Sequence, residues 1–265
     1  MIRKALLLFL SLTLSVRADD AADDAFQQRK FETARDLYGQ ARDKKETNHQ
    51  RWLQYTAQIV RCHTALGETD QAVSEFFYLC SVDPQTTFYD CIPLPWNPPF
   101  VVPGASSPVE KTAEDVLDSI KNPRPGPAAM LLAAGILSVS PQPDKRNRGL
   151  NLLGKLAQQE GPAAQLAAAM LWKQRIPTLR TANELAILEN AIERIPEPYR
   201  AGPYFLLARA ANAVGEREKA VLYWMRLPIF YSNDKLLAEA AVREAATALE
   251  KLGRYDQATR LRVDH

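Results

Sequence analysis

The chain has 265 residues, of which 33 are Lys or Arg and 31 are Asp or Glu, so its formal net charge is +2. This balance excludes recruitment of nucleic acid by charge alone, because phosphate backbones are held by clustered cations. A hydrophobic content of 46% is enough for a sizeable core. Only 11 glycines and few runs of β-branched residues argue against a large sheet, so the predicted class is all-α.

Residues 1–18 have the features of a secretory signal peptide. Arg3 and Lys4 form a basic start, residues 5–16 form an apolar run, and Ala18 offers a small residue for cleavage. The run is too short to span a bilayer comfortably, which favours a cleaved signal over an uncleaved anchor. We therefore expect a secreted or periplasmic protein with no membrane span after cleavage. Loss of the three basic residues of this segment would take the net charge from +2 to −1.

A helical hairpin is predicted over residues 52–82. Gly67 closes its first helix, since glycine best tolerates a left-handed cap. Ala72 and Phe76 lie on one face of the second helix, which Pro84 stops. Two helices joined by so short a turn must nearly touch at Ala72, so a small side chain is required there.

The pattern of an alanine followed four positions later by an aromatic residue recurs along the chain. The copies are Ala34 with Tyr38, Ala72 with Phe76 and Ala220 with Trp224, and a shorter copy runs from Gly253 through Tyr255 to Ala258. The first two alanines are 38 residues apart, and so are the last two. Recurrence is needed because one helical hairpin cannot bury its own apolar face.

This pattern resembles the tetratricopeptide repeat (TPR), in which A-x3-F and a later Pro recur about every 34 residues. The residues that carry the resemblance are Leu66, Gly67, Ala72, Phe76 and Pro84. The spacing here exceeds the family period by about one helical turn. In the first helix of the hairpin, Val60 and His63 stand where the family has Gly and Tyr. The resemblance implies a right-handed α-solenoid of antiparallel helix pairs.

Residues 83–127 interrupt the repetition, because they hold ten of the 18 prolines and cannot form regular helix. Their apolar residues are Ile92, Leu94, Trp96, Phe100, Val101 and Val102. This content is too high for a free linker, so we expect the segment to lie ordered against the helices. The alternative is an arm that grips a partner.

Further helices are predicted after this segment. They begin with Ser107, Pro108 and Glu110, which form a capping box with proline at the first helical position. Each of the next four helices opens with a proline or a capping residue and carries an apolar stripe. The predicted helices span residues 107–121, 127–139, 144–160, 162–175, 181–195, 204–214, 216–227, 235–252 and 254–262.

The repeats and the proline-rich segment define the expected organisation of the chain. It comprises a signal peptide at 1–18, TPR-like helical repeats at 19–84, a proline-rich insertion at 85–107, degenerate helical hairpins at 108–200 and TPR-like repeats at 201–265. The middle hairpins lack the consensus, so degenerate repeats and another helical-hairpin family both fit them.

An oxidising compartment would allow one disulfide among the three cysteines. Cys62 and Cys80 would differ by roughly 9 Å along the hairpin axis, which exceeds disulfide reach. Cys91 lies in the loop after the second helix. Cys80 and Cys91 are therefore the expected pair, with Cys62 a small buried hydrophobic residue.

The sequence favours a protein that is not an enzyme. It has no Gly-x-Ser-x-Gly, no His-Glu-x-x-His, no phosphate-binding loop and no dinucleotide fingerprint. Its three histidines, His49, His63 and His265, lack the spacing of metal ligands, so neither a metal site nor a cofactor is predicted.

The resemblance implies a concave groove, lined by outward residues of each first helix, that binds extended peptides or helices of a protein partner. The matching positions here are Gln54, Arg61, Phe205, Arg209, Asn212, Arg243 and Lys251. Four of these residues are cationic and none is acidic, which suits an acidic segment or a C-terminal carboxylate of the partner, although the family's carboxylate clamp of paired Lys and Asn is not reproduced. The alternative for these positions is an ordinary solvated helix face.

The functional hypothesis is a non-enzymatic scaffold that binds a protein or peptide in the bacterial periplasm or cell envelope. The alternative is a helical accessory domain, or an enzyme that acts on cell-wall material. The enzyme predicts a deep pocket with converging carboxylates, whereas the scaffold predicts a long open groove.

Overall fold

The computed structural model describes residues 20–97, 108–119 and 125–264, which contain helices and no strands. The all-α prediction is therefore confirmed for these residues. The first helical residues are 20–27, and the helices that follow are α2 (Phe31–Arg42), α3 (His49–Leu66), α4 (Thr69–Val82), α5 (Pro108–Asp118), α6 (Pro127–Ser138), α7 (Pro143–Leu156), α8 (Pro162–Arg175), α9 (Ala182–Glu193), α10 (Ala201–Ala213), α11 (Arg217–Phe230), α12 (Lys235–Lys251) and α13 (Tyr255–Asp264). None of the described helices is both long and apolar enough to cross a membrane.

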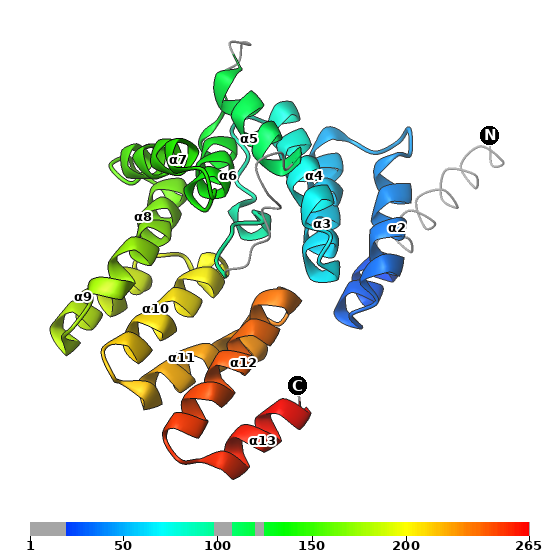
Figure 1. Cartoon of the computed structure of the whole chain (residues 1–265). Coiled ribbons are helices and arrows are strands. Elements are labelled where there is room, and N and C mark those ends of the chain that lie inside the picture. The colour runs from blue at the N-terminus through cyan, green and yellow to red at the C-terminus, as the bar shows by residue number, and fades with distance from the viewer. Residues whose placement is uncertain (1–19, 98–107, 120–124, 265) are drawn as a thin grey trace, which may run out of the picture.

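Most helices pack against their neighbours in sequence, and the resulting array curls so that α12 contacts α3 (Figure 1). At this contact Leu236, near the start of α12, lies beside Gly67, which follows α3. A Cβ atom added to Gly67 would sit 3.6 Å from the Leu236 side chain. The curl therefore places residues from the two ends of the chain around a common centre.

Four turns with the same geometry precede the four repeated alanines. The residue five positions before each alanine has a positive φ, and these residues are Arg29, Gly67, Gly215 and Gly253, with φ between 59° and 89°. In each turn the next residue donates its N–H to the carbonyl five positions back, at 2.9 Å. All four alanines are buried. The predicted copies thus share one local structure, a left-handed helix cap of the Schellman type.

Two of the hydrophobic clusters meet at α3. Tyr55, Ile59 and Cys62 face the N-terminal helices, where they pack with Phe31 and Tyr38. The opposite face of α3 contributes to the main core, which includes residues from α4 through α12. Because α3 is apolar on two faces, it links the first hairpin to the rest of the protein.

The proline-rich segment is ordered against the main core as far as residue 97. Ile92, Leu94 and Trp96 are each at least nine-tenths buried. The prediction that this segment packs on the helices is confirmed for these three residues, whose apolar side chains gain more by burial than by exposure. Phe100, Val101, Val102, Ser107 and the expected signal peptide at 1–18 lie outside the described residues.

Two of the observed helix ends differ from the predicted ones at positions next to a proline. α11 continues through Pro228 to Phe230, although the sequence predicted an end at residue 227. α10 begins at Ala201 rather than at residue 204, with Pro203 in its first turn. A proline in the first turn breaks no intrahelical bond, and one near the end removes only one. Ala201 and Gly202 at the start of α10 and Phe230 at the end of α11 line the same cavity.

Candidate functional site

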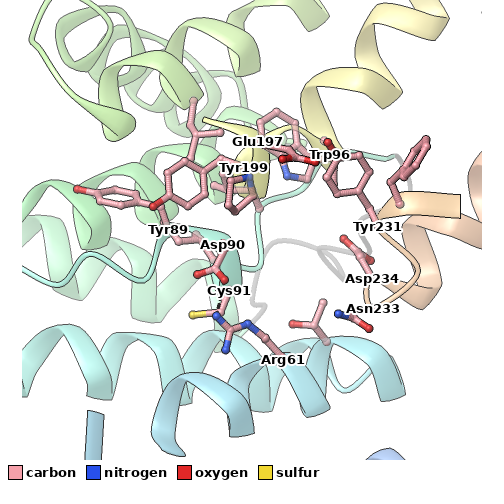
Figure 2. A pocket seen from close by; sticks show the side chains of 18 residues that line it. Arg61, Tyr89, Asp90, Cys91, Trp96, Glu197, Tyr199, Tyr231, Asn233 and Asp234 are labelled. Atoms are coloured by element: carbon pink, nitrogen blue, oxygen red, sulfur yellow. Dashed lines mark hydrogen bonds and ion pairs between the residues drawn. The ribbon is translucent and has the colours of Figure 1, made fainter. Parts of the chain in front are cut away.

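A cavity of about 360 Å³ lies where the curled array closes (Figure 2). We call it the central pocket. One part of its wall comes from α3, from the 3-10 helix η1 (Tyr89–Cys91) and from the extended segment that follows η1. The other part comes from the 3-10 helix η3 (Glu197–Tyr199), the start of α10 and the connection between α11 and α12. The polar and aromatic residues that line it are Arg61, Thr64, Tyr89, Asp90, Trp96, Glu197, Tyr199, Phe230, Tyr231, Asn233 and Asp234.

One side of the central pocket is formed by an ion pair between Arg61 of α3 and Asp90 of η1. A second guanidinium nitrogen of Arg61 donates to Gln58 Oε1 at 2.9 Å. Burial opposes the charge of Arg61, but the neighbouring Cys91 thiol and Asp90 carboxylate keep its pKa above the ordinary value. Arg61 is thus fixed within the protein, and its charge is balanced by Asp90.

Aromatic rings form much of the rest of the wall. The rings of Tyr89 and Tyr199 meet edge to face with centroids 6.0 Å apart, which joins η1 to η3. The ring of Tyr231 lies 6.1 Å from that of Tyr204 in α10. Burial raises the pKa of Tyr89, Tyr199 and Tyr231, so these phenols stay neutral at physiological pH.

Trp96 is seated against the first turn of α10. A Cβ atom added to Gly202 would lie 2.0 to 2.4 Å from atoms of the indole ring, so only glycine fits there. Pro95, beside Trp96, accepts a hydrogen bond at its carbonyl from Lys173 Nζ of α8. Burial, with a smaller contribution from Arg209, lowers the pKa of Lys173 to about 7. These contacts hold the proline-rich segment in place under the pocket.

The central pocket has more carboxylates than cations. Asp234 is the N-cap of α12, where its Oδ1 accepts from the Leu237 N–H at 3.1 Å. Burial raises the pKa of Asp234 to about 6, although this hydrogen bond opposes the shift. Glu197 is exposed at the rim. With Asp90, the lining therefore contains three carboxylates against the single cation Arg61.

The seven residues predicted to line a partner groove do not gather at one site. Gln54, Arg243 and Lys251 are exposed, whereas Arg209 and Asn212 are partly buried, and of the seven only Arg61 lines the central pocket. The choice of Phe205 is wrong, because its side chain is completely buried. The physical reason is that residues 202–208 of α10 are all buried, so this helix has no outward face at that point.

All three cysteines are free thiols in the structure, and all are buried. The expected bond between Cys80 and Cys91 is not formed in it, and Cys91 Sγ donates instead to the Phe88 carbonyl at 3.2 Å. The pairing stays a prediction for the oxidised chain. Burial raises the pKa of Cys62 and of Cys91 to about 12, so neither thiol ionises readily. The expectation that Cys62 is buried is confirmed, and its unpaired state stays a prediction for the oxidised chain.

Within the described part of the chain, no group of three His, Cys, Asp or Glu side chains is placed to hold a metal ion.

A second hollow of about 550 Å³ lies between α11 and α13, and we call it the outer cleft. Its lining includes Leu222, Met225, Leu252 and Leu261. Leu222 is 66% exposed. The outer cleft lacks the tyrosines of the central pocket. Besides its apolar residues it is lined by Glu218, Arg254, Gln257 and Arg260, of which Glu218 and Arg254 form an ion pair.

Reasoning from the sequence missed most of the central pocket. Tyr89, Asp90, Tyr199, Tyr231 and Asp234 lie in turns and 3-10 helices, where no helical periodicity marks an inner face. The available signal was the occurrence of aromatic and acidic residues together in connecting segments, since such segments carry binding residues more often than helix bodies do.

No family model matches the chain, and comparison with curated proteins and with solved structures gave no match either.

Proposed function

We propose that this chain is a right-handed α-solenoid of TPR-like hairpins and acts, after removal of residues 1–18, as a secreted or periplasmic scaffold that binds a protein or peptide partner. In this proposal the scaffold is not an enzyme. The partner segment lies along the inner surface of the curl, and one of its side chains enters the central pocket.

The observation that carries this proposal is the origin of the pocket wall. Its residues come from α3, η1, η3 and the α11 to α12 connection, which are separated by up to about 170 residues of sequence. A wall assembled from elements so far apart in sequence is formed only when the curl brings α3 and η1 against α10 and the start of α12. Binding there would depend on the curl itself, as expected for a scaffold with a concave inner surface.

The rim of the central pocket also offers an apolar surface that a partner could cover. Phe230 is 67% exposed, and Ile229 beside it is 62% exposed. Exposed apolar residues next to a pocket with polar groups are typical of a protein-binding surface. The outer cleft has exposed apolar residues too, so the two surfaces must be compared directly.

Two substitutions on α11 compare these surfaces. Phe230→Asp changes the rim of the central pocket, whereas Leu222→Asp changes the outer cleft at nearly the same exposure. Partners cross-linked to the full chain in cell-envelope extract would be quantified for both variants. We expect Phe230→Asp to lose the specific partner by tenfold or more, about 1.4 kcal/mol, and Leu222→Asp to retain it. If both variants retain the cross-linked partner, the partner does not bind at the central pocket.

The partner was expected to carry an acidic segment. Arg61 no longer supports this choice, because it is paired with Asp90. Arg243 and Lys251 remain exposed on α12, so an acidic segment could still bind there, outside the central pocket.

A second candidate function is an enzyme that acts on cell-wall material. Asp234 favours it, because burial holds the pKa of this carboxyl at about 6, in the range suited to a general acid, beside other carboxylates. Release of soluble fragments from purified cell wall, abolished by Asp234→Asn and retained by Phe230→Asp, would establish this function. Absence of such release would leave the scaffold as the sole candidate.

A further inference from the structure

The central pocket combines aromatic walls with an excess of carboxylates, and we propose that it binds a cationic side chain, the guanidinium of an arginine or the ammonium of a lysine in the partner. This inference rests on the proposed function and deepens it by naming the chemical group that enters the pocket.

The aromatic walls supply one part of the recognition. Figure 2 shows Tyr199, Trp96 and Tyr231 around the cavity, with Asp234 pointing toward it. The face of an aromatic ring attracts a cation within about 6 Å of its centroid. The chain makes this kind of contact itself nearby, where the Arg226 guanidinium lies 4.9 Å from the centroid of Tyr204.

The charges around the cavity supply the other part. Arg61 and Asp90 balance each other, which leaves Glu197 and Asp234 as lining carboxylates that form no ion pair within the described residues. Two further cations act on Tyr231, namely Arg200 and Arg226. Arg200 donates to backbone carbonyls after α9, and Arg226 lies over Tyr204. Neither of these two arginines is among the lining residues.

Other classes of ligand fit the cavity less well. An anion would meet the lining carboxylates Glu197 and Asp234, whereas the one cation among the described lining residues, Arg61, is paired with Asp90. A purely apolar group would cover Asp234 and Glu197 without replacing the water that solvates them, which costs free energy. A cation replaces that water with an ion pair and contacts the rings at the same time. A volume of about 360 Å³ admits a side chain but not a folded domain.

The test measures binding of small probes to the full chain by saturation-transfer NMR. The cationic probes are N-acetyl-arginine methylamide and N-acetyl-lysine methylamide, and the neutral probes of similar shape contain citrulline and norleucine. We expect the cationic probes to bind at about 1 mM and the neutral ones at least fivefold more weakly, since an isolated side chain lacks the rest of the partner. Equal binding of cationic and neutral probes, or no binding of the cationic ones, would overturn the inference.

A pair of carboxylate variants locates the binding. Glu197→Gln removes a lining charge, whereas Glu193→Gln removes an exposed charge four positions earlier that does not line the cavity. We expect Glu197→Gln to weaken binding of the arginine probe about threefold and Glu193→Gln to leave its binding unchanged. Tyr199→Leu should weaken it three- to tenfold through loss of a ring face. If Glu197→Gln and Glu193→Gln weaken binding of the arginine probe equally, the probe binds outside the central pocket and the inference is contradicted.

Failure of this inference is distinguishable from failure of the proposed function. If the probes do not bind but Phe230→Asp still loses the cross-linked partner, the scaffold function is supported, and the proposal that a cationic side chain enters the pocket is contradicted. If the cationic probes bind as expected but Phe230→Asp loses no cross-linked partner, the pocket recognises a cation and the proposed scaffold function is contradicted.

Discussion

The repeat turns and the proline-rich segment hold their backbones in different ways. The four turns use one set of local hydrogen bonds and one positive φ, so each copy resembles the others. The segment at residues 92–97 is held by contacts that occur once, between Trp96 and Gly202 and between Lys173 and the Pro95 carbonyl. The comparison indicates that the repeats build the array, while unrepeated contacts shape the pocket. Substitutions at the contacts of this segment should therefore lower the free energy of unfolding more than substitutions in a repeat turn.

The largest effect is expected for Gly202→Ala. The new Cβ would lie 2.0 Å from the indole of Trp96, so either the ring or the first turn of α10 must move. Overpacking of this kind costs about 3 kcal/mol of unfolding free energy, measured by urea denaturation. Gly154→Ala in α7 is the matched control, because nothing lies within 4 Å of its Cβ. A loss under about 0.5 kcal/mol for Gly202→Ala would show that the Trp96 contact is not fixed.

Lys173 should make stability depend on pH. Burial and Arg209 lower its pKa in the folded protein to about 7, from an ordinary 10.5. Between these values the unfolded chain binds more protons than the folded chain, so the free energy of unfolding rises with pH. The expected slope is up to about 1.4 kcal/mol per pH unit between pH 7 and 9.

Lys173→Met isolates this contribution. The variant should lose the slope between pH 7 and 9, whereas Lys111→Met, at an exposed position of α5, should keep it. Denaturant unfolding at several pH values provides the measurement. An unchanged slope in Lys173→Met would mean that the amine is solvated in the folded protein and does not anchor Pro95.

The repeat turns were predictable from the sequence because their structure is local. Gly67 followed by Ala72 gives both the left-handed cap and the close approach of two helices, and the same pair recurs near the C-terminus. Arg29 is the exception, since no glycine marks its turn. The correspondence was still visible, because Ala34 and Tyr38 keep the spacing of the other copies.

The central pocket was not predictable, because it depends on where the curl closes. The outward position assigned to Phe205 assumed that α10 has a free face, but neighbouring helices and Trp96 cover it. Arg61 is one of the predicted cations of the groove, but it pairs with Asp90, which lies 29 residues further on in a 3-10 helix. Neither relation follows from spacing along one helix.

Asp234 should lower stability above its pKa. Burial raises that pKa to about 6 from 3.8, so between these values the folded chain binds more protons than the unfolded chain. The free energy of unfolding therefore falls as pH rises from 4 to 6. Asp234→Asn retains an acceptor for the Leu237 N–H and should gain about 1 to 2 kcal/mol at pH 7, after allowance for partial exposure.

The same titration should affect the pocket. Binding of the arginine probe to the wild-type chain is expected to strengthen severalfold between pH 5 and 7 as Asp234 ionises, and to change less in Asp234→Asn. Asp70→Asn, at an exposed position in the first turn of α4, is the control for stability. A gain for Asp70→Asn as large as that for Asp234→Asn would contradict the role of burial.

The smallest effects are expected in the repeat turns themselves, where the four copies allow changes in opposite directions. Arg29 has a φ of 59°, which costs a residue with a Cβ about 1 kcal/mol relative to glycine. Arg29→Gly should therefore stabilise the chain by about 0.5 to 1 kcal/mol. This is less than the full strain, because glycine also raises the conformational entropy of the unfolded chain.

Gly215→Ala should destabilise the chain by about 1 kcal/mol, since φ is 89° and nothing lies within 4 Å of the new Cβ. Gly39→Ala, inside α2 with equal space and no positive φ, should stabilise the chain. If Gly215→Ala cost as much as Gly202→Ala, the distinction between local turns and unrepeated contacts would not hold.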